Sequence, residues 1–209
     1  VLRGAVGRLA LFILPLCCFL FVHAGAVIEV YLPGAFSRTD EVFRIFLLAL
    51  PLRCAVYNPV LVGTGRANWA LYGSVGDLCV NAALSVLLVR FLLPDHAQWA
   101  LLGPAAATVL ATWGQVAVLV TLLSRSLQQP LNTLLPWGRL GRVGLVSIVA
   151  SIASGWAIFD WQTGPGLRLV VATAVFAPVA AILLRTWHRP DWDELLGMGR
   201  AMTRREATP

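Results

Sequence analysis

The sequence contains no lysine, and only 12% of its 209 residues are charged. All 16 basic residues are arginines, and the net charge is +6. Because about 25% of the residues of a soluble domain are charged, this shortage of charge argues against a water-soluble protein. The arginines stand singly between apolar runs, a pattern typical of loops beside a bilayer rather than of a nucleic-acid-binding surface. We therefore expect no nucleic-acid partner.

Residues that carry enzyme or metal chemistry are also scarce. The four cysteines, Cys17, Cys18, Cys54 and Cys79, lie in apolar runs without metal-ligand spacing. We interpret them as small apolar fillers rather than as disulfides or metal ligands. The sequence offers no nucleophile triad, phosphate-binding glycine loop or acidic pair suited to acid–base catalysis. We therefore expect a protein that is not an enzyme and has no cofactor.

Hydrophobic residues make up 58% of the chain and gather in long runs. A helix needs about 20 apolar residues to cross the hydrocarbon core of a bilayer. Six stretches qualify, at residues 9–32, 44–62, 69–93, 99–123, 143–159 and 167–184. We therefore predict an all-α fold in which residues 1–189 form a six-helix transmembrane bundle. The chain starts at Val1 without a signal-peptide pattern, so we expect a fragment of a longer protein.

The arginines also predict how the bundle lies in the membrane. With the N-terminus inside, eleven arginines fall in inside segments and four, at positions 38, 44, 90 and 168, fall outside. Basic residues concentrate on the cytoplasmic side of membrane proteins, so we predict that both ends of the chain are cytoplasmic. The long loop at residues 124–142 is expected to lie along the cytoplasmic surface.

The last twenty residues, 190–209, differ from the spans. Asp191 is a good N-cap with Glu194 as its capping-box partner, and the apolar residues that follow share one helical face. Three arginines then come near the end of the chain. We predict a cytoplasmic interfacial helix and tail against anionic lipids, with a loosely ordered tail as the alternative.

Arg53 is the most unusual residue, because it lies near the middle of the second predicted span. A charge at that depth costs at least about 2.5–3.5 kcal/mol, so Arg53 needs a partner or a watery cavity. Asp77, at a similar depth in the next span, is the predicted partner. The two form either a structural ion pair or part of a translocation path. The dipeptide Asn58-Pro59 is predicted to break the second helix near its cytoplasmic third.

Other polar and small residues follow helical spacing. Asn81 lies four residues after Asp77, so the two residues share one face of the helix, and Ser74 and Ser85 extend this polar stripe. The stripe either points toward protein or water, or serves only interhelical hydrogen bonds. Two further faces, which we interpret as close helix packing, consist of Gly103, Ala107, Ala111 and Gln115, and of Ser147, Ser151 and Gly155. We interpret His23 as a hydrogen-bonded structural residue.

Four stretches together resemble the C-terminal half of the polysaccharide-export flippases, which translocate lipid-linked oligosaccharides. They belong to the multidrug, oligosaccharidyl-lipid and polysaccharide exporter superfamily. The stretches are LFILPL at 11–16, FRIFLLALPLRCAV at 43–56, GTGRANWALYGSVGDLCVNAALSVLLV at 63–89 and LLGPAAATVLATWGQ at 101–115. Gly63, Gly65 and Arg66 fit the family's turn, and Asn81 fits its mid-helix asparagine, but Pro104 departs from its glycine-rich pattern. The peptidoglycan-precursor flippases are a related candidate.

The resemblance implies a two-bundle exporter in the bacterial inner membrane, of which this chain is one bundle. The implied partners are a polyprenyl-pyrophosphate-linked saccharide, membrane lipids, an N-terminal helix bundle of the same protein, a polysaccharide polymerase and glycosyltransferases. Arg53 would attract the pyrophosphate, Asn58 and Asn81 would bind substrate, and Asp77 would couple transport to an ion. Two other functions stay open: a cation-coupled multidrug exporter, and a structural membrane subunit.

Overall fold

The computed structural model describes residues 2–32, 34, 38–54, 57–92, 102–158 and 163–187. Within these residues every element is helical, as predicted. In chain order the elements are α1 (Leu2–Val22), α2 (Ala24–Tyr31), α3 (Thr39–Leu47), the 3₁₀ helix η1 (Leu50–Cys54), α4 (Tyr57–Gly63), α5 (Ala67–Leu92), α7 (Leu102–Leu127), α8 (Leu131–Leu134), α9 (Trp137–Ala157) and α10 (Pro165–Trp187). The predicted C-terminal segment, 190–209, lies outside the described residues.

Five helices are long and apolar enough to cross a membrane: α1, α5, α7, α9 and α10. Each corresponds to one of the six predicted spans. Much of their apolar surface is exposed, and in α5 even the most apolar window buries no residue. Apolar surface on this scale is suited to contact with lipid rather than water. The described chain therefore has the character of a helical membrane protein.

The second predicted span, 44–62, is divided among three short helices, α3, η1 and α4. The predicted break at Asn58-Pro59 agrees with the end of η1 at Cys54 and the start of α4 at Tyr57, two residues before Pro59. Pro59 lies in the first turn of α4, where a helix has no partner for a backbone N–H in any case. The interruption begins earlier, where α3 ends at Leu47 and Pro51 follows within η1. Pro51 has no N–H to offer the Leu47 carbonyl, so the α-helix does not continue.

Side chains from two other helices occupy the carbonyls that this interruption frees. The Cys17 thiol of α1 donates to the Leu47 carbonyl over 3.2 Å. The Trp113 indole N–H of α7 donates to the Leu48 carbonyl, also over 3.2 Å. Unpaired backbone carbonyls are costly in an apolar environment. The interruption is therefore stabilised by tertiary contacts, and Cys17 acts as a donor as well as a filler.

The first predicted span, 9–32, is also interrupted, at His23 between α1 and α2. His23 is buried, and its Nε2 lies 2.9 Å from Ser154 Oγ of α9. Ser154 Oγ donates its own proton to the Ser151 carbonyl, so the Nε2–H of His23 is the donor to Ser154. This contact confirms the interpretation of His23 as a hydrogen-bonded structural residue.

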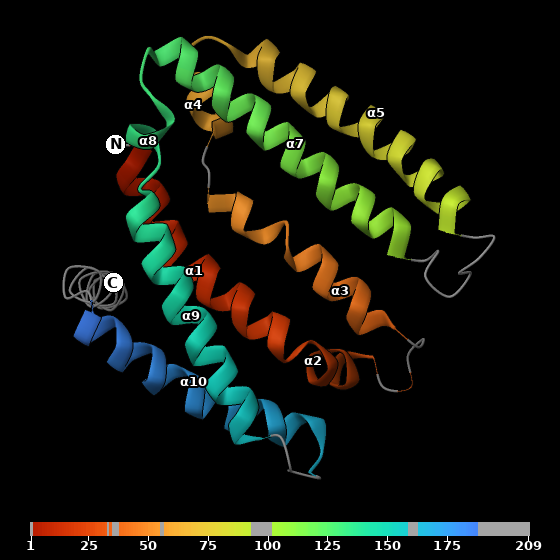
Figure 1. Cartoon of the computed structure of the whole chain (residues 1–209), viewed down its shortest axis with the longest axis vertical. Coiled ribbons are helices and arrows are strands. Elements are labelled where there is room, and N and C mark those ends of the chain that lie inside the picture. Colours follow the sequence, from red (N-terminus) through yellow and green to blue (C-terminus); the bar gives the residue numbers. More distant parts are fainter. Residues whose placement is uncertain are drawn as a thin grey trace, which may run out of the picture.

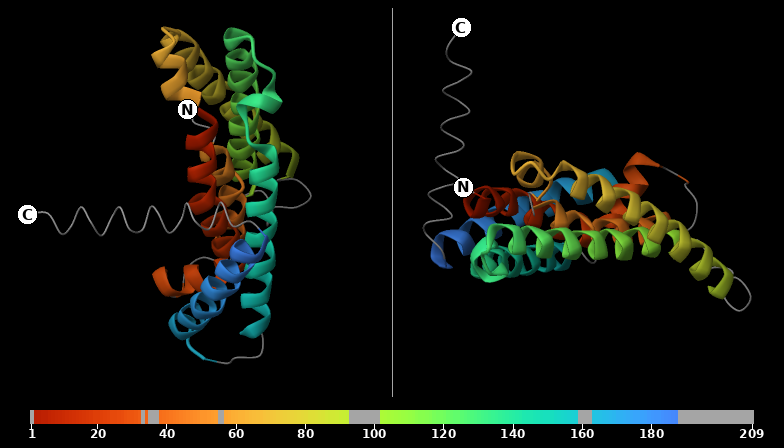
Figure 2. Two further views of the ribbon diagram at one scale, coloured as in Figure 1. Left: turned by 90° about the vertical axis from the view of Figure 1, so that its left-hand side faces the viewer. Right: turned by 90° about the horizontal axis from the view of Figure 1, so that it is seen from above.

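The helices pack as neighbours that the chain order alone does not suggest. In Figure 2, α7 and α9 lie on one side of α1 and α3, and contacts join α1 to α9 and α3 to α7. In Figure 1, α7 lies between α5 and α3. Five of the predicted close-packing residues, Gly103, Ala107, Ala111, Ser147 and Ser151, are buried, whereas Gln115 and Gly155 are partly exposed.

The two ends of the bundle differ in charge. Figure 1 shows the start of α1, the turn from α4 to α5 and the connection from α7 through α8 to α9 at one end. This arginine-rich end carries Arg3, Arg8, Arg66, Arg125, Arg139 and Arg142. At the opposite end, α3 begins with Asp40 and Glu41. Among the described residues, the arrangement matches the charge pattern from which the topology was predicted.

Candidate functional site

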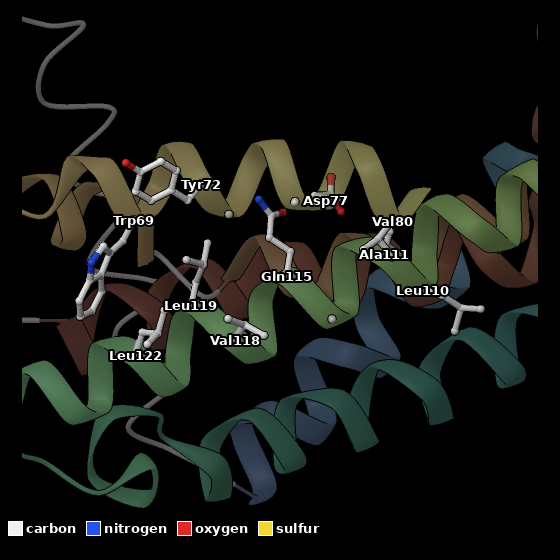
Figure 3. A pocket seen from close by; sticks show the side chains of 13 residues that line it. Trp69, Tyr72, Asp77, Val80, Leu110, Ala111, Gln115, Val118, Leu119 and Leu122 are labelled. Atoms are coloured by element: carbon white, nitrogen blue, oxygen red, sulfur yellow. The ribbon is translucent and has the colours of Figure 1, made fainter. Parts of the chain in front are cut away.

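A cavity of about 460 Å³ lies between the facing sides of α5 and α7. Its wall is mainly apolar, with Val118, Leu119 and Leu122 from α7 and two aromatic rings, Trp69 and Tyr72, from α5. Asp77 and Gln115 are the polar side chains of its central part, one from each helix (Figure 3). A mainly apolar cavity with a few convergent polar groups is the usual form of a ligand site.

Asp77 is the acidic residue of this cavity. Its Oδ1 atom is buried, and no described residue gives it a hydrogen bond. In Figure 3 the Gln115 amide extends from α7 toward the side of α5 that carries Asp77. A carboxylate oxygen in apolar surroundings is stable only with a proton, a cation or a donor group nearby. A cation or a hydrogen-bond donor in the cavity would therefore complement this oxygen.

The cavity approaches the arginine-rich end at the turn between α4 and α5. The Arg66 guanidinium lies 4.5 Å from the centre of the Trp69 ring, which itself lines the cavity. Cation–π contacts of this kind orient a charge over an aromatic face. The cavity thus has a positive group, Arg66, near one end and the Asp77 carboxylate about three helical turns farther along the chain.

Backbone geometry at this turn explains the glycine before Arg66. Gly65 has a φ of +74°, a left-handed conformation that costs little only for glycine. The Arg66 N–H bonds the Leu61 carbonyl, and the Gly65 N–H bonds the Val62 carbonyl. These two bonds define a Schellman motif, which ends α4 and sets the start of α5. The turn thereby fixes where Arg66 and Trp69 stand.

Asn81 lies one helical turn beyond Asp77 on α5. Its Oδ1 accepts a hydrogen bond from Ser85 over 3.1 Å and lies 3.3 Å from the hydroxyl of Thr108 of α7, whose shorter bond goes to the Pro104 carbonyl. The side-chain oxygen of Asn81 thus lies at the contact between α5 and α7, which agrees with the alternative that this polar stripe serves interhelical hydrogen bonds. Its predicted contact with substrate stays a prediction. Ser74 bonds only the Ala70 carbonyl of its own helix.

The other two predicted site residues lie on the interrupted segment. Arg53 is in η1, which packs against α1 and α3, whereas Asp77 is on α5, which packs against α7 and α4. Asn58 is in the first turn of α4. The side chains of Arg53 and Asn58 lie outside the described residues. Their roles, and the ion pair between Arg53 and Asp77, stay predictions.

Gln115 is the site residue that the sequence pattern did not identify. Its position continues the small-residue face of Gly103, Ala107 and Ala111, and the pattern assigned it to helix packing. In the structure it lines the cavity beside Asp77. The feature of the sequence that could have indicated this role is the polar amide of Gln115 in the middle of an apolar span. Comparisons with protein-family models, curated proteins and solved structures found no match to this chain.

Proposed function

We propose that this chain is half of a transporter that moves a polyprenyl-pyrophosphate-linked saccharide across the bacterial inner membrane. The observation that carries the proposal is the buried Asp77 oxygen in a cavity between two long apolar helices. Ionisable residues are expensive inside a membrane and mark ion or substrate pathways. The four stretches that resemble polysaccharide-export flippases supply the substrate class.

In this proposal Asp77 takes up and releases the coupling proton or cation. Arg53 binds the pyrophosphate by a charge-assisted contact, with Asn58 and Asn81 as further substrate ligands. The interruption between α3 and α4 supports the assignment of Arg53, because discontinuous helices commonly form the substrate sites of transporters. The six-span bundle, the cytoplasmic termini and a second bundle belong to the same proposal.

A specific feature of the cavity favours a second candidate, the export of organic cations. Trp69 and Tyr72 line the same cavity as Asp77, toward its other end along α5 (Figure 3). Aromatic faces attract organic cations, and a carboxylate adds charge complementarity. In this case Asp77 would contact the transported cation directly.

The test compares two substitutions of the same chemical type. Asp77→Asn should abolish surface polysaccharide in cells that depend on this protein, while Asp40→Asn, at the opposite end of the bundle, should leave it normal. Both variants should reach the membrane in normal amounts. Arg53→Ala should also abolish polysaccharide. Normal polysaccharide with either the Asp77 or the Arg53 variant would contradict the flippase proposal.

The same cells also test the two other candidate functions, an exporter of organic cations and a structural membrane subunit. Loss of resistance to organic cations in the Asp77→Asn strain, with normal polysaccharide, would identify the second candidate. A structural subunit instead predicts that Arg53→Asp combined with Asp77→Arg restores function. Failure of this exchange together with loss of polysaccharide would support the flippase.

A further inference from the structure

A second cavity, of about 580 Å³, lies among α1, η1, α7, α8 and α9. Aliphatic side chains form most of its wall, together with two tryptophans, Trp113 and Trp137. Thr121 is the one hydroxyl-bearing residue among those that line it. Cavities of this size accommodate sizeable ligands, but this wall offers few hydrogen-bonding groups to a sugar. Its chemistry fits a hydrocarbon chain.

The cavity runs from the interrupted helix to the arginine-rich end of the bundle. Trp113, which bonds the Leu48 carbonyl, lines it beside Pro51 and Leu52 of η1. At the other end it is lined by Leu131 at the start of α8, Leu135 just after α8, and Trp137 at the start of α9. The Trp137 side chain is 55% exposed. A tryptophan that is partly exposed and also packs against apolar side chains is typical of the headgroup level of a bilayer.

Two exposed arginines continue the walls of the cavity at this end. Arg3 precedes Val6 by three residues on α1, and Arg125 follows Thr121 by four residues on α7. Residues three or four apart share a helical face, and both Val6 and Thr121 line the cavity. Neither arginine forms an ion pair with another described residue.

The carboxylates of the described residues lie away from the arginine-rich end. Glu29 is in α2, Asp40 and Glu41 begin α3, and Asp77 lines the cavity between α5 and α7. The arginine-rich end therefore has no described acidic side chain to balance Arg3 and Arg125. An external anion at the headgroup level would complement them.

We propose that this cavity binds an anionic phospholipid of the bilayer. One acyl chain occupies the apolar cavity, the phosphate contacts Arg3 and Arg125, and Trp137 lies beside the headgroup. A glycerophospholipid is favoured over a saccharide carrier because its anion stays at the interface, where both arginines lie, and because the wall lacks sugar-binding groups. The proposal does not depend on the transported substrate.

The test measures lipid binding to the purified full chain. The protein is placed in nanodiscs of phosphatidylcholine with one-fifth phosphatidylglycerol, released into detergent, and examined by native mass spectrometry for retained phosphatidylglycerol. Arg3→Gln combined with Arg125→Gln should weaken retention by about thirtyfold, as expected for two arginine–lipid contacts. Arg44→Gln combined with Arg90→Gln removes the same charge outside this end and should leave retention unchanged.

A second pair of variants tests the cavity itself. Gly144 lines the cavity and Gly138 does not, although both are in α9 and a Cβ atom at either position would meet open space. Gly144→Leu should abolish retention, and Gly138→Leu should preserve it. Equal retention of phosphatidylcholine and phosphatidylglycerol by the original chain, or equal effects of the two leucine variants, would overturn the proposal. Displacement of the lipid by equimolar polyprenyl phosphate would assign the cavity to a carrier lipid instead and would also overturn it.

Discussion

At the residue scale, two side-chain hydrogen-bond donors satisfy backbone carbonyls that have no partner within their own helix. The Leu47 carbonyl has no helical partner because Pro51 lacks an N–H, and the Leu48 carbonyl has none because the Leu52 N–H bonds the Ala49 carbonyl. Cys17 and Trp113 supply donors from two other helices. An interhelical hydrogen bond in a membrane protein contributes only about 0.6 kcal/mol on average. Two such bonds nevertheless connect the interruption to α1 and to α7.

Trp113→Phe tests this role, because phenylalanine keeps an aromatic ring but has no N–H. We expect a loss of about 0.6 kcal/mol in the free energy of unfolding, or somewhat more because a carbonyl is left without a donor. Thermal unfolding in detergent measures the change. Trp156→Phe is the matched control, since Trp156 is 82% exposed, and it should have little effect. Equal losses in the two variants would rule out a role for the Trp113 bond.

At the element scale, the contact between α5 and α7 forms the site. Gly73 of α5 faces Leu119, a buried residue that packs with Leu61 and Leu123. A Cβ atom at Gly73 would lie 2.8 Å from the nearest Leu119 methyl carbon. The missing side chain thus allows the two helices to approach closely at the cavity.

Gly73→Ala and Gly76→Ala separate helix propensity from packing. Alanine is favoured over glycine within a helix by about 1 kcal/mol, and Gly76 has open space around it. Gly76→Ala should therefore be neutral or stabilising. At Gly73 the Leu119 side chain has to move, so overpacking of about 1–3 kcal/mol should offset or exceed that gain. Unfolding of both variants in detergent checks the difference, and indistinguishable stabilities would contradict the packing argument.

The sequence predicted part of this element-scale arrangement. It predicted the helices themselves, the small-residue faces and the importance of Asp77, because apolar runs and charges are local properties. It did not predict that Asp77 would share a cavity with Gln115 while Arg53 lies on a segment against α1 and α3. Of the divided second span, α4 contacts α5, whereas α3 is separated from α5 by α7 (Figure 1).

At the scale of the whole molecule, charge separates the two ends of the bundle. The described part of the arginine-rich end carries arginines without carboxylates, and the opposite end carries both. The positive-inside rule predicts that the arginine-rich end faces the cytoplasm. The connection that contains α8 should then be cytoplasmic, and the connection before α10 should be external.

Cysteine labelling checks this orientation. Gln129 and Gly164 are exposed residues in connections at the two ends of the bundle. In intact cells a membrane-impermeant maleimide should label Gly164→Cys and should reach Gln129→Cys only after lysis. The unsubstituted chain is the control for its native cysteines. Labelling of Gln129→Cys in intact cells would reverse the predicted topology.

The sequence by itself determined that this chain is helical and suited to a membrane, where its long helices lie, and which end carries the positive charge. These properties follow from local hydrophobicity and from charges counted along the chain. Only the tertiary structure decided that Cys17 and Trp113 pair with the carbonyls freed near Pro51 and that Asp77 faces a cavity with Gln115. Both depend on which side chains from distant helices meet a carbonyl or carboxylate, and that pairing is set by packing rather than by position in the sequence.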